Sequence, residues 1–133
     1  MSSSVNITRS VDIENEIRNA LKRYMTAYCR PLQAGFSIPS VLITQVGGSD
    51  ANQIDTFDVT LDARAADEAT ANETLRNAIG LLRKAAGEQT TAIRHIEVNS
   101  SGSWGTDPVR PDLSMCSARI RVVAHLENAT ITV

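Results

Sequence analysis

The chain has 133 residues, with 13 basic and 15 acidic side chains and a formal charge of -2 at pH 7. Apolar residues make up 42% and charged residues 21%, which describes one globular domain and argues against a disordered or membrane-spanning chain. Domains that grip nucleic acid are usually strongly basic, and base-reading surfaces need several aromatic side chains, so this composition argues against both.

The first ten residues are polar and include three consecutive serines, without the apolar stretch of a signal peptide. We expect residues 1–10 to form a flexible segment, and we expect the protein to reside in a reducing cytoplasm with no membrane partner. In that compartment Cys29 and Cys116 are predicted to be free thiols that pack as small hydrophobic side chains.

Apolar residues recur at three- and four-residue spacing between Ile13 and Tyr28. This periodicity predicts a helix over residues 11–29. Ser10 or Asp12 is a suitable N-cap, and Pro31 would end the helix.

Two strands are predicted next, over residues 41–46 and 57–62. In the second, Phe57, Val59 and Leu61 alternate with polar residues, which is typical of a strand with one buried face. The intervening residues 47–52 resemble a turn, so the two strands are predicted to form an antiparallel hairpin.

A second helix is predicted over residues 66–86, followed by strands over residues 92–99 and 114–126. Residues 99–113 are predicted to form a long loop, and residues 127–133 a tail or a short edge strand. The predicted fold is therefore one α+β domain over residues 11–126. Its two helices pack on one face of a four-stranded, mostly antiparallel sheet, in the order α-β-β-α-β-β.

Charged residues form two rows on the predicted strands. Asp55, Asp58 and Asp62 make an acidic row, and Arg119 and Arg121 make a basic row. One interpretation is a solvated sheet face. The other is a charged surface that complements a neighbouring subunit and fixes its register.

The single tryptophan, Trp104, lies in the predicted long loop together with Arg110. Trp104 is interpreted either as a lid over one end of the core or as an anchor for a partner. The candidate interface residues are thus Asp58, Asp62, Trp104, Arg110, Arg119 and Arg121.

Neither a nucleophile elbow nor a phosphate loop or dinucleotide-binding fingerprint is present in the sequence. His95 and His125 fall on predicted strands and could share a polar face with Glu97, which leaves a small ligand-binding or metal-dependent module as an alternative. We otherwise expect no enzymatic activity, no cofactor, and solvated or interfacial histidines.

Several segments together resemble a known family. They are the helix that starts Asp12-Ile13-Glu14, the run Pro39-Ser40-Val41-Leu42-Ile43, the strand Phe57-Asp58-Val59-Thr60-Leu61-Asp62-Ala63-Arg64-Ala65 before an Ala-rich helix, and Pro-Asp-Leu before a strand that includes Arg119-Ile120-Arg121-Val122. In size and element order the chain resembles the tail terminator (tail completion) proteins of long-tailed bacteriophages and prophages.

The resemblance implies a virion structural protein without catalytic residues. Proteins of this family form a ring, typically a hexamer, that caps the tail tube, stops its polymerisation and provides a surface for joining the head. The implied partners are copies of the chain itself, the tail tube protein and a head connector or neck protein, with DNA passing through the lumen. The implied location is the virion tail or neck, after assembly in the host cytoplasm. Other neck or minor capsid proteins remain an alternative, as does an adaptor that binds one protein through Trp104.

Overall fold

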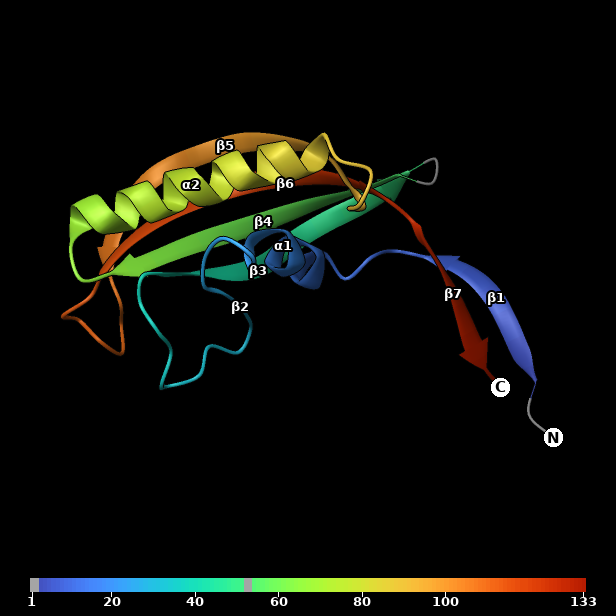
Figure 1. Cartoon of the computed structure of the whole chain (residues 1–133), viewed down its shortest axis with the longest axis horizontal. Helices are drawn as coiled ribbons and strands as arrows, with labels where there is room; N and C mark the ends of the chain where they lie inside the picture. Colours follow the sequence, from blue (N-terminus) through green and yellow to red (C-terminus); the bar gives the residue numbers. More distant parts are fainter. Residues whose placement is uncertain (1–2, 52–53) are drawn as a thin grey trace.

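The structure is a computed structural model that describes residues 3–51 and 54–133. Within these residues the chain is α+β, with two helices and seven strands in two sheets (Figure 1). The predicted four-stranded sheet with the order α-β-β-α-β-β is wrong. Three further strands lie in segments predicted as helix, as flexible segment, and as tail or short edge strand.

The elements follow one another along the chain as β1 (Ser4–Arg9), α1 (Ile13–Leu21), β2 (Ala27–Cys29), β3 (Ser40–Ala51), β4 (Ile54–Ala65), α2 (Glu68–Ala86), β5 (Ile93–Thr106), β6 (Ser114–His125) and β7 (Glu127–Thr132). The second helix and the last long strand were predicted almost to the residue.

The larger sheet has five strands in the order β2-β3-β4-β6-β5. The short β2 is parallel to β3, and the other neighbours are antiparallel. Both helices pack on the same face of this sheet, and the other face is open (Figure 1). The largest fully buried side chains lie between the helices and the sheet: Ile13, Ile17, Leu21, Val41, Ile43, Val59, Leu61, Leu75, Leu82, Ile93, Ile120 and Val122.

The first helix is shorter than predicted, because it ends after Leu21 and not near Cys29. Asp12 is its N-cap and accepts a hydrogen bond from the Asn15 N–H. After the helix, residues 27–29 pair with residues 41–43 of β3, so a strand contact replaces the last turns that periodicity predicts.

The Glu14 side chain stabilises the path that the chain takes after α1. Its carboxylate accepts hydrogen bonds from Arg30 Nε at 3.0 Å and from the Gln45 backbone N–H at 3.1 Å. Burial of the carboxyl opposes its ionisation, but these bonds outweigh it and hold the pKa of Glu14 below its usual value. The side chain therefore joins α1, the segment after β2 and β3.

The β3–β4 hairpin is longer than predicted, since Gly47 and Gly48 lie inside β3 and not in a turn. The register shifts between Gln45 and Gly47, which marks a bulge. A Cβ atom on Gly48 would lie 2.8 Å from the Thr56 carbonyl oxygen, so glycine is needed here for close backbone approach. Asn52, the last residue of the predicted turn, lies outside the described residues.

The predicted long loop over residues 99–113 is also wrong in its first half. Residues 99–106 continue β5 and pair with β6, with register shifts at Val98/Ser100 and Ser101/Ser103. Gly102, between the last two, has φ of +80°, a conformation that disfavours other residues. These bulges interrupt the alternation by which a strand is recognised in the sequence.

The two ends of the chain form the second sheet. Residues 4–9, predicted to be flexible, form β1, and β1 pairs antiparallel with β7 from Ser4↔Thr132 to Arg9↔Glu127. We call this two-stranded sheet the terminal arm; it projects from one end of the domain (Figure 1). Among residues 3–51 and 54–133, no helix is long and apolar enough to cross a membrane.

Candidate interaction surfaces

The terminal arm has one apolar and one polar face. Val5 lies opposite Ile131 and Ile7 opposite Ala129, so these four side chains share a face. Val5 is 44% exposed and Ile131 is 38% exposed. On the other face Thr130 Oγ1 donates to Asn6 at 2.8 Å, in a ladder of polar side chains. The arm thus presents an uncovered apolar stripe.

The open face of the larger sheet carries both charged rows. Asp58 lies opposite Arg121, and Arg121 Nε donates to the Asp58 carboxylate at 3.2 Å. Asp62 lies opposite Ser117 and accepts its hydroxyl hydrogen bond. The acidic and basic rows are therefore adjacent within one subunit, with Arg119 opposite Thr60.

Asp55 does not belong to the acidic row, contrary to the prediction. It has the same strand parity as Phe57 and lies on the face that the helices cover, where it is 2% exposed. Neither carboxylate oxygen has a hydrogen-bond partner among the described residues. Asp55 lines a shallow groove with Ser10 and Gly48, near the start of the arm.

Trp104 lies on β5 and not in a loop, opposite Cys116 of β6. It is 49% exposed, so about half of this residue is accessible to a partner. Arg110 does lie in the loop between β5 and β6, where its guanidinium stands 5.8 Å from the centre of the Phe36 ring and pairs with Asp112 at 3.3 Å.

No pattern in the sequence indicates the pair between Arg64 and Asp107. Arg64 Nε donates to Asp107 at 2.6 Å, and both side chains are buried. The other Asp107 oxygen accepts the backbone N–H groups of Val109 and Arg110. Burial opposes ionisation, but these bonds lower the pKa of Asp107 below its usual value. The pair fixes the β5–β6 loop onto β4.

The two histidines are not arranged as metal ligands. His125 Nε2 lies 2.8 Å from Arg94 Nη2, and His125 Nδ1 lies 2.8 Å from the Leu126 carbonyl oxygen. His95 is opposite Val123 of β6, and Glu97 is opposite Arg121. Over the described ranges, no group of three or more His, Cys, Asp or Glu residues could hold a metal ion.

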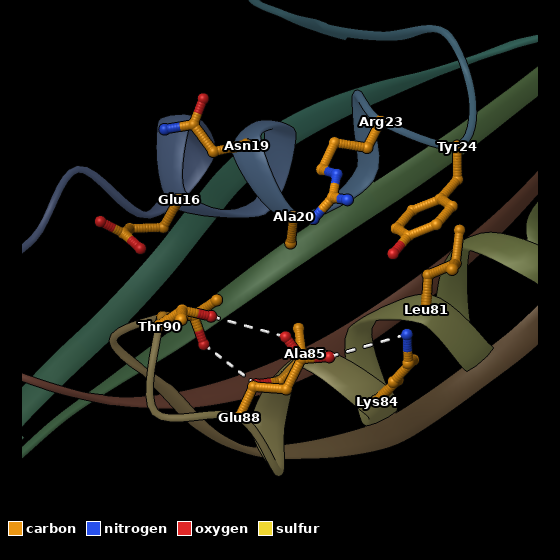
Figure 2. A pocket seen from close by; sticks show the side chains of 11 residues that line it. Glu16, Asn19, Ala20, Arg23, Tyr24, Leu81, Lys84, Ala85, Glu88 and Thr90 are labelled. Atoms are coloured by element: carbon orange, nitrogen blue, oxygen red, sulfur yellow. Dashed lines mark hydrogen bonds and ion pairs between the residues drawn. The ribbon is translucent and has the colours of Figure 1, made fainter.

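A groove of about 300 Å³ separates the two helices (Figure 2). Tyr24, 55% exposed, lies at its side, with Arg23 and Lys84 5.6 and 5.5 Å from its ring centre. Lys84 also pairs with Glu88 across one helical turn, at 3.8 Å. The charges of the groove are thus largely occupied by contacts between its own side chains.

Cys29 and Cys116 are both free, as predicted. They lie on β2 and β6, three strand spacings apart, or about 14 Å, which is too far for a disulfide. Burial raises the pKa of both thiols.

Comparison with known proteins adds no relative, since neither the protein-family models nor the curated protein sequences contain a match to this chain.

Proposed function

We propose that this protein is a virion structural subunit that assembles with copies of itself into a closed ring, and that the ring is the tail terminator of a long-tailed phage. The observation that carries the proposal is the terminal arm. Both ends of the chain are used to build a two-stranded sheet that projects from the domain and exposes Val5 and Ile131 (Figure 1).

An isolated two-stranded sheet is only marginally stable in water. The arm gains stability if its apolar stripe is buried against another surface. In a closed ring every subunit has a neighbouring subunit that can provide that surface. Burying such side chains contributes about 25 cal/mol per Å² of apolar area. The arm is therefore better explained as an assembly element than as part of the core.

The open sheet face supports the same function. Its paired charges, such as Asp58 with Arg121, leave little net charge for binding a polyanion. A face of this kind suits a subunit that surrounds a DNA channel without gripping the DNA. In the proposed assembly the remaining surfaces meet the tail tube protein on one side and a head connector or neck protein on the other.

The test is reconstitution with a tail tube protein of the same phage. We expect the purified protein to form rings, seen by negative-stain electron microscopy, that bind the tube at one end and stop its growth. Tubes that elongate equally with and without the protein would contradict the proposed terminator function. A ring that binds only head-connector components would instead place the protein elsewhere in the neck.

A further inference from the structure

The 14-residue strand β5 forms one edge of the larger sheet, and its outer side has no strand partner among the described residues. An open edge presents unpaired backbone N–H and C=O groups and is a ready template for another strand. Proteins commonly protect such edges with charged residues or proline, but residues 99–106 of β5 contain neither. Within this stretch the two bulges are the feature that hinders pairing with another strand.

The arm offers matching strands. β1 and β7 each have one paired edge, toward each other, and one outer edge without a strand partner in the described sheets. Residues 128–132 are uncharged, and three of the five (Thr130, Ile131 and Thr132) are β-branched, which favours strand pairing. Six residues of strand span about 20 Å, and residues 99–106 span about 26 Å, so the two edges are comparable in length.

The arm cannot reach this part of β5 in its own subunit. Trp104 is opposite Cys116, and β6 continues from Cys116 for nine residues to His125, about 30 Å, before the arm begins. The arm is shorter than this distance and points away from the sheet (Figure 1). The open end of β5 and the arm thus lie at opposite ends of the molecule, which suits a head-to-tail contact between copies.

We propose that the terminal arm of one copy pairs with the outer edge of β5 in the next copy, around residues 99–106, with Trp104 as the apolar anchor. This inference rests on the proposed function, since it supplies the contact between ring subunits. Strand addition provides backbone hydrogen bonds, and the apolar stripe of Val5 and Ile131 covers the exposed ring of Trp104. Because donor and acceptor surfaces differ, each copy uses both, and the chain of contacts can close into a ring.

Trp104 is the only tryptophan, so its fluorescence reports on this edge alone. The experiment mixes two full-length variants. The first, Val5→Lys with Ile131→Lys, keeps Trp104 but has a charged arm. The second, Trp104→Phe, has an intact arm and contributes no tryptophan emission. Circular dichroism of each variant alone verifies that both are folded.

We expect the emission of the first variant to shift to shorter wavelength when the second is added, because its Trp104 becomes buried by arms supplied in trans. Val5→Lys with Ile131→Lys in both proteins should abolish the shift. An unshifted spectrum in a mixture that native mass spectrometry shows to co-assemble would overturn the arm-to-β5 contact and leave the ring intact. A wild-type protein that never assembles would overturn the ring itself.

Discussion

Arg121 donates a hydrogen bond from Nε to the Asp58 carboxylate at 3.2 Å, directly across the register of β6 and β4. The two charged rows that the sequence suggests for contacts between subunits are therefore neighbours within one subunit. Both side chains are partly exposed, so the pair contributes about 0.2–1 kcal/mol to folding. Its main effect is to neutralise the open sheet face.

Reversing the charge of Arg121 should lower stability, because a glutamate there would face Asp58 on one side and Glu97 on the other. We expect Arg121→Glu to cost about 1 kcal/mol in urea unfolding. Arg119→Glu is the matched control, since Arg119 is opposite Thr60 and Ser100, and its cost should stay within about 0.5 kcal/mol. Equal losses in the two variants would contradict the pairing.

Removing the Asp107 carboxylate should lower the stability of the protein far more than Arg121→Glu does. Asp107→Ala leaves Arg64 buried and without its carboxylate partner, and we expect a loss of about 3–5 kcal/mol in the free energy of unfolding. Urea denaturation of wild type, Asp107→Ala and Asp107→Asn at pH 7 measures it. A loss below 1 kcal/mol for Asp107→Ala would show that the pair does not hold the loop.

The pair between Arg64 and Asp107 also predicts that the free energy of unfolding depends on pH. The pKa of Asp107 is lower in the folded state than its usual value of 3.8, so the unfolded state takes up a proton first as the pH falls. The stabilisation is complete well above 3.8 and is lost as the pH falls from there through the lower folded value. The stability gap between wild type and Asp107→Asn should therefore be constant near neutral pH and narrow below pH 4. A gap that widens in acid would contradict the assignment.

Replacing Asp55 with a neutral residue should stabilise the folded protein. A buried carboxylate without a hydrogen-bond partner among the described residues is unfavourable. Asp55→Asn is therefore expected to raise the free energy of unfolding of the unassembled protein, measured by urea denaturation, by about 1 kcal/mol or more. Asp58→Asn, on the open face, is the control and should lower stability slightly. A destabilising Asp55→Asn would indicate a partner for this carboxylate that only the acid can satisfy.

The two cysteine thiols should react slowly, and Cys29 should react before Cys116. Burial raises the pKa of both Cys29 and Cys116, which keeps them protonated, and Cys116 is fully buried. We expect Cys29 to react first with a thiol reagent and Cys116 only on unfolding, monitored by mass spectrometry of native and urea-treated protein. Rapid labelling of Cys116 in the native state would contradict the packing of β6.

Periodicity was sufficient for the elements whose burial is regular along the chain. The alternation of Phe57, Val59 and Leu61 and the capped helix after Asp67 are local patterns, and both are found where they were expected. β2, by contrast, exists only because β3 lies beside it, a non-local pairing that overrides the helical spacing of the same residues.

The errors at the candidate surfaces have a similar origin. Gly48 and Gly102 lie in segments that the sequence predicts as turn and loop, but both lie inside long strands. Gly48 allows close approach to the neighbouring backbone, and Gly102 adopts a positive φ at a bulge. The arm joins β1 to β7 across almost the whole length of the chain, so no local pattern indicates their pairing. A short edge strand over residues 127–133 is one of the two predictions for that segment, whereas β1 lies in a segment predicted to be flexible. Arg64 and Asp107 are likewise 43 residues apart, with no local pattern that connects them.

Assembly through the arm is tested most directly by the native mass of three proteins: wild type, Ile131→Lys and Thr132→Lys. The two substitutions are adjacent but lie on opposite faces of the arm, so they add the same charge to the apolar and the polar side. The proposed ring predicts one closed oligomer for wild type and Thr132→Lys, and a folded monomer for Ile131→Lys. A wild-type monomer at every concentration, or an Ile131→Lys protein with the wild-type mass, would contradict it.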